Sequence, residues 1–327
     1  MASNWSNIDW SSLDRLRNAF LEGRVGEADY WHSESDLDSY NQTYAQRIGW
    51  KWDYVLRELQ QRKWEPPAGE TLDWGCGTGI AHRAFFKAFP PQHGELLSLW
   101  DRSPKAMNYA ANAAHESLPE LALNLEPAVS PTTLLISHVL TELNETDLAS
   151  LMDRVRSAQC VVWVEPGTYE ASRRLIALRE ELRNVFCPVA PCLHARPCGL
   201  LTDENQPHWC HHFADPPASV FTDPNWSRFS RLTGIDLRSL PLSYLVLDRR
   251  PTAMLSHQTV RMIGRPRVYK AHALLLGCSP DGVCECRLSK RNLPEIFKRA
   301  KKDQLTSLQE WRLEGTEIAG LKECLPE

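Results

Sequence analysis

Four cysteines are the residues of this chain whose type and spacing point most directly to chemistry. They are Cys192, Cys198, Cys210 and Cys278. Five residues separate the first two, eleven separate the second and third, and sixty-seven separate the third and fourth. A proline precedes each of the first two and stiffens their loop, and an apolar run leads into the fourth. Four thiolates can hold an iron–sulfur cluster or a zinc ion.

The spacing of these cysteines separates the two kinds of metal site only in part. Zinc sites favour closely paired cysteines, and the chain contains no C-x-x-C pair. Wide, irregular spacing is more typical of a 4Fe–4S cluster, so we expect such a cluster and keep zinc as the alternative. Neighbouring thiols and imidazoles could compete or assist, and a set of buried free cysteines is a further reading. These neighbours are Cys187, Cys284, Cys286, His194, His208, His211 and His212.

A glycine loop is the second group of residues with recognisable chemistry. Gly75, Gly77 and Gly79 stand between a predicted strand and a predicted helix, where backbone amides favour an anion. Asp73 precedes the loop, and Asp101 ends the next strand, where a carboxylate can bind both hydroxyls of a ribose. The spacing differs from that of dinucleotide-binding loops and resembles that of S-adenosylmethionine-dependent methyltransferases. We therefore predict that these five residues bind S-adenosylmethionine.

The catalytic residues are harder to assign. His138 and Glu142 follow the fourth predicted strand, where a methyltransferase-like fold places residues near the methyl group. They are candidates for acid/base chemistry, although a histidine at a strand end is more often a packing residue. The Asn/Asp-Pro-Pro-aromatic motif of amine methyltransferases that act on bases is missing at this position.

The pattern of apolar residues predicts an α/β protein, and the resemblance of the glycine loop to that of S-adenosylmethionine-dependent methyltransferases implies a Rossmann-like class I methyltransferase core. Strand-like runs alternate with helices, which indicates a parallel sheet covered on both faces. The predicted strands are 71–74, 96–100, 121–125, 133–137 and 160–164, and the predicted helices are 80–89, 104–115, 147–157 and 170–183. One amphipathic helix is expected before them, over 36–62. After them we expect strands at 243–247, 259–263, 268–276 and 283–288, in a small sheet or barrel, and a basic helix over 293–302.

These elements divide the chain into four predicted segments. Residues 1–66 are helical, 67–185 form the cofactor-binding core, 186–240 are a cysteine-rich cluster insertion, and 241–327 are β-rich and basic. Hydrophobic residues make up 43% of the chain and charged residues 24%, as in an ordinary globular protein. No apolar stretch approaches the roughly 18 residues of a membrane span. The N-terminus lacks signal and transit patterns, so we expect reduced thiols and a cytoplasmic location.

The charge is distributed unevenly along the chain. The net charge is −4, yet residues 249–302 contain thirteen Lys or Arg and three acids, so this segment carries about +10 and the remainder about −14. Such polarity is typical of a surface that faces nucleic acid, although a solvated basic surface without a partner would look the same. The predicted RNA-binding residues are Arg261, Arg265, Arg267, Lys270, Lys298 and Arg299. Strand alternation would place the first three on one face.

The ordered combination of these motifs resembles one family. The glycine loop, the Val-Glu-Pro-Gly-Thr strand end, Pro-Cys-x5-Cys, Trp-Cys-His-His-Phe and Leu-Leu-Leu-Gly-Cys are similar to those of mitochondrial small-ribosomal-subunit assembly factors with a methyltransferase-like fold. That family also has bacterial members. The resemblance covers roughly residues 70–302 and implies a methyltransferase-type core, a 4Fe–4S cluster on the four cysteines, and binding to small-subunit ribosomal RNA. The missing transit pattern suggests a bacterial member.

These observations lead to one main hypothesis and two alternatives. The main hypothesis is an S-adenosylmethionine-dependent protein with a 4Fe–4S cluster that acts on the small ribosomal subunit, as an RNA methyltransferase. The first alternative is a non-catalytic assembly factor in which cofactor and cluster serve folding and RNA docking. The second is a small-molecule methyltransferase with a structural zinc site, which the basic segment disfavours. We expect a monomer that does not bind membranes.

Overall fold

The computed structural model describes residues 5–21, 30–91, 94–126, 129–252 and 255–324. The chain forms two compact units. The first unit contains Met1–Gln60, Glu65–Glu165 and Ala214–Leu240, and the second contains Gln61–Trp64, Pro166–Phe213 and Pro241–Glu327. The four predicted segments do not coincide with these units, because the end of the predicted cysteine-rich insertion belongs to the first unit.

The first unit is built on a parallel sheet. Its strands are β1 (Glu70–Trp74), β2 (Leu96–Trp100), β3 (Ala122–Asn124), β4 (Thr133–Ser137) and β5 (Cys160–Pro166), in the order β3-β2-β1-β4-β5. All the neighbouring pairs run parallel. The strands read as apolar runs because helices cover both faces, and the middle of β4 and β5 has no exposed surface. The predicted Rossmann-like fold class is confirmed.

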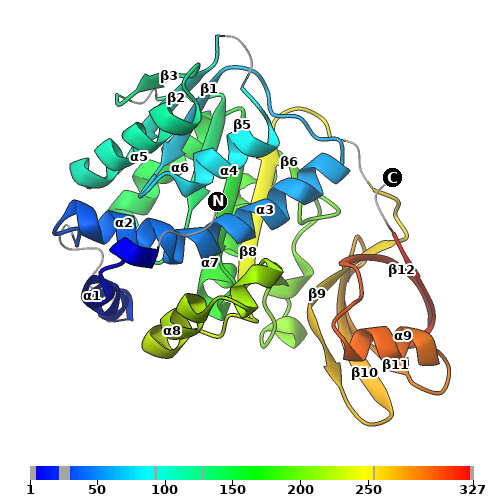
Figure 1. Cartoon of the computed structure of the whole chain (residues 1–327). Coiled ribbons are helices and arrows are strands. Elements are labelled where there is room, and N and C mark those ends of the chain that lie inside the picture. The colour runs from blue at the N-terminus through cyan, green and yellow to red at the C-terminus, as the bar shows by residue number, and fades with distance from the viewer. Residues whose placement is uncertain (1–4, 22–29, 92–93, 127–128, 253–254, 325–327) are drawn as a thin grey trace. The chain divides into compact units, whose positions relative to one another are not determined.

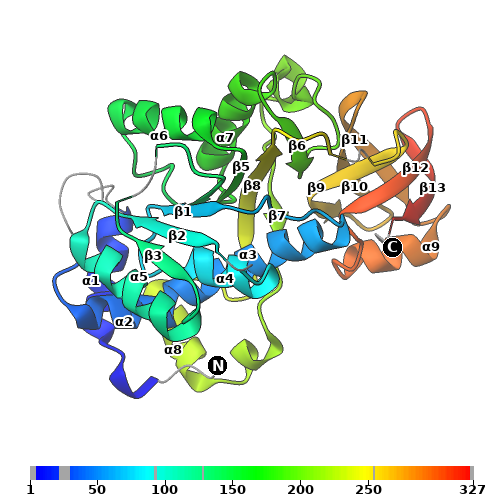
Figure 2. The same cartoon turned by 90° about the horizontal axis from the view of Figure 1, so that it is seen from above.

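Helices cover both faces of this sheet (Figures 1 and 2). Figure 2 shows α6 (Glu145–Ser157) on one face and α3 (Tyr44–Gln61), α4 (Ile80–Ala88) and α5 (Pro104–Ser117) on the other. Helix α5 buries Ala106, Ala110 and Ala114, whose small side chains at steps of four residues allow a close approach to the sheet. Helix α8 (Pro224–Thr233) and the short η5 (Ala218–Phe221) complete the unit.

The N-terminal region of the first unit corrects one prediction. The single helix expected over 36–62 is two helices, α2 (Glu34–Gln42) and α3, and α1 (Trp10–Leu21) precedes them. Ser33 begins α2 with a capping box that involves Asp36. Thr43 separates α2 from α3 because its hydroxyl bonds to the Ser39 carbonyl and its backbone leaves the helical conformation. The hydrophobic periodicity continues through the break, so it could not reveal it.

The second unit contains a closed barrel and a cysteine-bearing region. The barrel has the order β10-β11-β13-β12-β9. Its strands are β9 (Thr259–Val268), β10 (His272–Ser279), β11 (Gly282–Ser289), β12 (Leu308–Glu314) and β13 (Glu317–Glu323), and α9 (Pro294–Lys301) packs against β9 and β10. The sequence predicted the first three strands and the helix, but β12 and β13 were missed.

The remaining elements of the second unit surround the cysteines. They are α7 (Tyr169–Leu182), β6 (Cys187–Ala190), β7 (His212–Phe213), β8 (Pro241–Asp248), and the short helices η3 (Gly199–Leu201) and η4 (Asp203–Asn205). Strand β8 pairs antiparallel with β6 and β7 and is not part of the barrel. Within the described residues, every helix of the chain is too short or too polar to cross a lipid bilayer.

Candidate functional site

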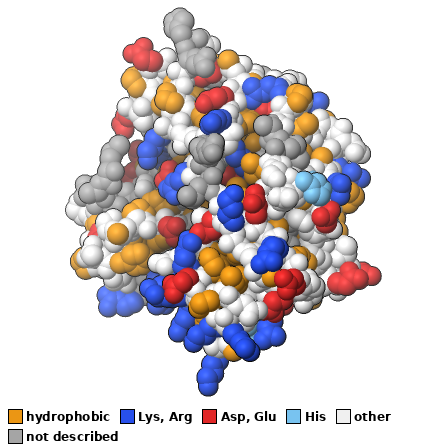
Figure 3. Space-filling model, turned by 90° about the vertical axis from the view of Figure 1, so that its right-hand side faces the viewer, with side chains coloured by type: hydrophobic (Ala, Val, Ile, Leu, Met, Phe, Trp, Pro, Cys, Tyr) orange, Lys and Arg blue, Asp and Glu red, His pale blue; other side chains and the backbone are white. Residues whose placement is uncertain are grey.

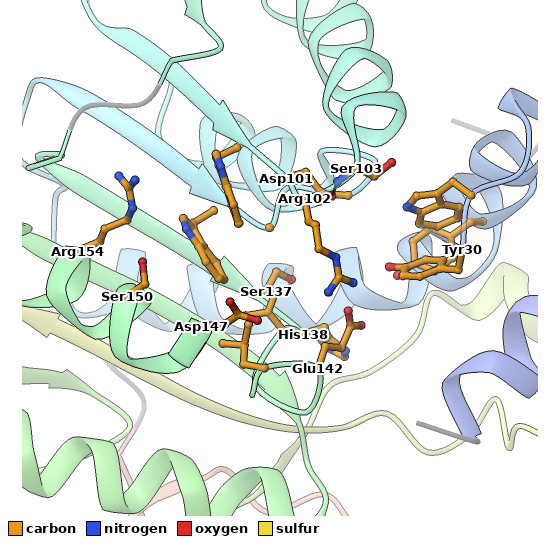
Figure 4. A pocket seen from close by; sticks show the side chains of 18 residues that line it. Tyr30, Asp101, Arg102, Ser103, Ser137, His138, Glu142, Asp147, Ser150 and Arg154 are labelled. Atoms are coloured by element: carbon orange, nitrogen blue, oxygen red, sulfur yellow. Dashed lines mark hydrogen bonds between the residues drawn. The ribbon is translucent and has the colours of Figure 1, made fainter. Parts of the chain in front are cut away.

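A pocket of about 490 Å³ opens where the strand order of the first unit reverses, next to the ends of β1, β2 and β4. Open parallel sheets bind ligands at this position, because the loops on either side diverge. Figure 4 shows side chains reaching the pocket from the end of β2, the segment after β4, helix α6 and Tyr30. The lining residues include Trp74, Gly75, Gly77, Trp100, Asp101, Arg102, Ser137, His138, Glu142, Asp147 and Arg154.

Asp101 ties the glycine loop to the end of β2. One carboxylate oxygen accepts a hydrogen bond from the Gly77 amide at 2.8 Å, and the other accepts one from the Ser103 amide at 2.8 Å. A carboxylate oxygen has a second lone pair, so both oxygens can still accept a bond from a ligand hydroxyl. Gly77 has a positive φ of 51°, and a side chain there would project into open space. The loop therefore leaves room for a ligand beside Asp101.

Asp73 and Gly79, which the sequence predicts to contact the cofactor, do not line the pocket. Asp73 is fully buried and does not line the pocket; it accepts a hydrogen bond from His82 Nδ1 at 2.8 Å. Gly79 begins α4 with a φ of 79°, and a Cβ there would lie 2.4 Å from the His82 ring. Both residues therefore fix the loop and the start of α4 from behind, and their predicted contact with the cofactor stays a prediction.

The segment after β4 is held in a conformation that few residues adopt. His138 has a φ of 56°, in the left-handed region that costs a non-glycine residue energy. Glu165 stabilises this turn by accepting hydrogen bonds from the Val139 and Leu140 amides at 3.2 and 3.0 Å. The Lys51 ammonium lies 3.4 Å from His138 Nε2. His138 is thus held at the pocket wall with a lysine behind it.

Burial shifts the pKa values of the titratable groups around this pocket. It lowers the pKa of Lys51 to about 7, assisted by the charge of Arg47, and lowers that of His138 well below its usual range. Burial also raises the pKa of Glu142 to about 8, and the nearby Asp101 charge adds to this effect. Groups that exchange protons near neutral pH therefore line the pocket or lie directly behind it.

Several pocket residues were not found by sequence reasoning. Trp74 and Trp100 stack at 4.6 Å and 19° on the pocket wall, and each ends a strand. Tyr30, Trp31 and Tyr40 form an aromatic wall that comes from the N-terminal region. Lys51 lies on the mainly apolar buried face of α3, and a basic residue among buried positions was the signal that could have identified it.

The four predicted cysteines meet in the second unit. Cys192, Cys198, Cys210 and Cys278 line one cavity of about 50 Å³, which we call the thiol cavity. Its other walls include apolar side chains of α7 and the barrel, and the arginines Arg179 and Arg261. Cys284 and Cys286 lie elsewhere, with their sulfur atoms 3.3 Å apart, and Cys187 does not line the cavity. The folded chain thus brings together the four thiols that are far apart in sequence.

The backbone around the thiol cavity is firmly held. The Cys210 carbonyl accepts hydrogen bonds from the Ser172 and Ser243 hydroxyls, each at 2.7 Å. The Cys198 amide donates to Glu180 at 3.0 Å, and Glu180 pairs with Arg179. Burial raises the pKa of Cys198 to about 11 and that of Cys278 to about 12. A metal bound to the sulfur atoms would favour their thiolate form, which burial alone disfavours.

The four cysteines offer donors of the type that a metal cluster uses. Among the described residues, no group of three His, Cys, Asp or Glu side chains is arranged to hold a metal ion. The four thiols do line one shared cavity, and four thiolates suit a 4Fe–4S cluster as well as zinc. The cluster stays a prediction, in which Cys192, Cys198, Cys210 and Cys278 would be the sulfur ligands.

The predicted RNA-binding residues do not form one uninterrupted basic face. Arg261 is only 2% exposed and lines the thiol cavity, so it lies apart from the exposed arginines of the same strand, and its RNA contact stays a prediction. The alternation fails because Gly264, with a φ of 66° and its amide bonded to the His211 carbonyl, interrupts the regular strand. Arg265 and Arg267 are exposed beyond this point and pair with Asp303 and Glu285.

The other three predicted RNA-binding residues lie at the surface of the second unit. Lys270 is exposed, Lys298 is 65% exposed, and Arg299 pairs with Glu323. Figure 3 shows Lys and Arg side chains gathered in the lower part of the face drawn there, with Asp and Glu among them. The surface is therefore mixed in charge, and its binding to RNA stays a prediction.

A comparison with known families decides where the chain belongs. The profile of the family described as "Mitochondrial small ribosomal subunit Rsm22" matches residues 41–307. The chain belongs to this family. The resemblance inferred from the motifs is confirmed, and the match extends beyond residues 70–302 at both ends. The family description names the mitochondrion, so the predicted cytoplasmic location is not confirmed. No curated protein matches the chain.

Solved structures show a distant likeness to methyltransferases. A candidate RNA methyltransferase from Pyrococcus horikoshii is 10% identical, with a TM-score of 0.37, over 69% of this chain and 88% of its own. The magnesium protoporphyrin IX methyltransferase of Synechocystis with bound S-adenosylhomocysteine is 13% identical, with a TM-score of 0.37, over 72% and 98%. A plantazolicin methyltransferase is 12% identical, with a TM-score of 0.37, over 74% and 100%.

Proposed function

We propose that this protein binds S-adenosylmethionine in the first unit and acts on small-subunit ribosomal RNA as a methyltransferase. The observation that carries the proposal is the pocket at the reversal of strand order, where Asp101 and an open glycine loop face a group of residues with shifted pKa values. Membership of the Rsm22 family, whose description names the mitochondrial small ribosomal subunit, supports the ribosomal target.

The residues of the pocket have distinct roles in this proposal. Asp101 binds the ribose hydroxyls, and the loop around Gly77 leaves space for the rest of the cofactor. The cofactor, when bound, supplies an activated methyl group. His138 lines the pocket, and its lowered pKa keeps the imidazole neutral, so that it can accept a hydrogen bond from the substrate. Glu142, which binds a proton up to about pH 8, can donate a hydrogen bond to an acceptor on the substrate.

The second unit contributes a metal centre and a surface in this proposal. Cys192, Cys198, Cys210 and Cys278 hold a 4Fe–4S cluster, which fixes the cysteine loops against the barrel. The exposed side chains of Arg265, Arg267, Lys270, Lys298 and Arg299 contact phosphates of the RNA. A zinc ion on the same thiols is the alternative, and the lack of closely paired cysteines in the sequence disfavours it.

A non-catalytic assembly factor is the second candidate function. The observation in its favour is the segment after β4, Ser137–Glu142, which lacks the Asn/Asp-Pro-Pro-aromatic motif of base-amine methyltransferases. In this reading the same pocket binds the cofactor and the same surface binds RNA, but no methyl group is transferred.

Two linked assays test the proposal. Calorimetry with S-adenosylmethionine should show one binding site per chain. Small subunits isolated from cells that lack the protein should then gain labelled methyl groups when they are incubated with the protein and labelled cofactor. Cofactor binding without methyl transfer would favour the assembly factor, and no binding by the folded protein would refute the pocket assignment.

A further inference from the structure

The barrel of the second unit has the strand order of a fold that commonly binds oligonucleotides. Its strands close in the order β10-β11-β13-β12-β9, and α9 lies between β11 and β12 in the chain. Strands β11 and β13 pair parallel, whereas the other neighbouring pairs run antiparallel. This is the strand order of the OB-fold, which binds ligands on its second and third strands and on the loop between its first and second strands. The corresponding parts here are β10, β11 and the loop that joins β9 to β10. A fold alone does not establish a function, so the side chains at these positions must decide.

The outer face of β10 is covered at one end and open at the other. Near the end of the strand, Leu276 and Cys278 pack against the apolar cluster that contains Ile176 of α7. At the start of the strand, His272 pairs with Ser289 of β11, and the loop before it is exposed. The loop end of this face is therefore the part that remains accessible to a ligand.

The loop between β9 and β10 carries an exposed tyrosine. Tyr269 is 49% exposed, and its amide donates to the His272 carbonyl at 2.8 Å, which closes the loop. The Tyr269 ring stacks on the His272 ring, with the centroids 4.9 Å apart and the planes at 16°. His272 thus holds the tyrosine from one side, and the other side of the ring can accept a planar group. Proteins that bind single-stranded nucleic acids stack bases on aromatic rings placed in this way.

Positive charge surrounds this ring. Lys270 follows it in the loop, and the Lys290 amide donates to the Ala271 carbonyl at 2.9 Å, which places Lys290 and Arg291 beside the loop. These three cations are exposed, and none of them forms an ion pair within the part of the chain that the structure describes. An aromatic ring among such cations matches a polynucleotide, because bases can stack on the ring while phosphates contact the cations.

The acids of the neighbouring strands already have partners. Glu285 of β11 pairs with Arg267, and Glu317 of β13 lies within 3.9 Å of the Arg287 guanidinium. These two carboxylates are therefore matched by arginines of the same strands, and the cations of the loop stay available for phosphates.

We propose that the loop between β9 and β10 is a binding site for unpaired RNA bases, in which the Tyr269 ring stacks on a base and the neighbouring cations contact phosphates. This inference rests on the RNA-binding role proposed above, and it specifies the form of the RNA as single-stranded. In a duplex the bases stay stacked on one another, so the tyrosine finds no free base there. Stacking supplies affinity that salt hardly affects, whereas the phosphate contacts weaken as salt rises.

The test measures the affinity of the full-length protein for a labelled single-stranded RNA of about 12 nucleotides, a length within the site size of one OB-fold. A duplex of the same sequence and length is the second probe. Tyr269→Ala removes the ring, Tyr269→Phe keeps it, and Lys270→Gln removes one charge. Phe221→Ala is the matched control, because it removes a ring that is 52% exposed in the first unit. Fluorescence anisotropy over a range of salt concentrations gives both the affinity and its salt slope.

The variants should differ in which quantity they change. Tyr269→Ala should lose about 5- to 150-fold in affinity for the single strand, with the salt slope of the wild type. Lys270→Gln should reduce that slope by about 0.7, the value for one phosphate contact to a single strand. Tyr269→Phe and Phe221→Ala should bind like the wild type. The duplex should bind equally well to Tyr269→Ala and to the wild type.

The outcomes separate this site from the proposed function. Wild-type protein that binds neither the single strand nor small-subunit ribosomal RNA overturns both. If the wild type binds the ribosomal RNA but Tyr269→Ala keeps full affinity for the single strand, the site alone is refuted. A loss in Tyr269→Ala that also flattens the salt slope as much as Lys270→Gln does would show that the ring only holds the cations in place, and stacking would be refuted.

Discussion

The two cavities of this protein differ in how their polar groups are satisfied. In the pocket of the first unit, backbone amides already hydrogen-bond both oxygens of Asp101, and Glu165 accepts from two amides and from Trp163. In the thiol cavity of the second unit, burial raises the pKa of Cys198 and Cys278, and Arg261 adds a buried cation. Both oxygens of Asp101 thus already have partners within the protein, whereas the thiols of the second cavity are neutral unless a bound metal favours their thiolate form.

This difference predicts that the two units respond separately to the loss of their ligands. Removal of the metal should unfold or loosen the cysteine-bearing region and leave cofactor binding in the first unit intact. Removal of the cofactor should change little in the metal content. The predictions below test this separation, beginning with the largest expected effect.

Replacement of one cysteine ligand should have the largest effect. Cys210→Ser should lose nearly all of the iron and its visible absorbance, because a serine hydroxyl replaces one of four thiolate ligands. Iron analysis of anaerobically purified protein measures this, and calorimetry should show an unchanged affinity for S-adenosylmethionine. Cys324→Ser is the matched control, because Cys324 does not line the cavity. Full iron content in Cys210→Ser would remove this residue from the ligand set.

Replacement of Asp101 should weaken the first site alone. Asp101→Ala removes a charged acceptor worth about 1.5–3 kcal/mol, which is a loss of affinity for S-adenosylmethionine of about 10- to 150-fold. Calorimetry measures the affinity, and the iron content should stay at the wild-type level. Asp153→Ala is a suitable control, since Asp153 is 82% exposed on α6 and does not line the pocket. Equal affinity in wild type and Asp101→Ala would exclude Asp101 from the site.

Charge reversal on the second unit should affect RNA binding and neither ligand site. The triple variant Arg265→Glu, Arg267→Glu and Lys298→Glu should weaken binding to small-subunit ribosomal RNA. It should also reduce the slope of log affinity against log salt by up to about three, one for each lost phosphate contact. Filter binding over a range of salt concentrations measures both quantities.

A second triple variant controls for net charge. Arg57, Arg156 and Arg238 are exposed residues of the first unit, and their reversal to Glu changes the net charge by the same amount. This control should keep the wild-type salt slope. If both triple variants lose affinity equally, the basic residues of the second unit act only through net charge, and the predicted RNA surface is wrong.

The smallest expected effect concerns the pH dependence of stability. The pKa of Glu142 is raised from 4.5 to about 8, so the folded protein retains a proton that the unfolded chain releases. Stability contributed by this proton is therefore lost as the pH rises between these two values. Glu142→Gln cannot ionise, so its free energy of unfolding should fall less than that of the wild type between pH 5 and pH 8, by on the order of 1 kcal/mol. Denaturant unfolding at both pH values measures this, and a steeper fall in the variant would contradict the assignment.

Local patterns predicted the first unit well. The alternation of apolar runs and helices placed the five parallel strands β1 to β5, because each buried parallel strand is a short run that neighbouring helices flank. The glycine loop and Asp101 follow two of those strands directly, so their meeting at one edge could be expected from the topology. The break at Thr43 could not be expected, because the hydrophobic periodicity continues through it. Lys51 was missed, although a basic residue among buried positions of α3 was a signal for it.

The second unit was predicted less completely because its contacts join distant segments. The four cysteines were identified from their clustering and from the family resemblance, and the structure gathers them around one cavity. The position of Arg261 depends on Gly264, whose left-handed conformation breaks the alternation that would have put three arginines on one face. Strands β12 and β13 close the barrel, but they contain few buried apolar residues. Their apolar pattern was therefore too weak to predict them.

The most direct test of the ribosomal role is crosslinking of the protein to RNA in cells, combined with mapping of RNA methylation after deletion. We predict that crosslinks concentrate on small-subunit ribosomal RNA and that at least one methylation on that RNA disappears with the protein. Wild-type protein should restore the methylation, and Asp101→Ala should not. Crosslinks no denser on this RNA than on large-subunit RNA, with every methylation retained, would contradict the account.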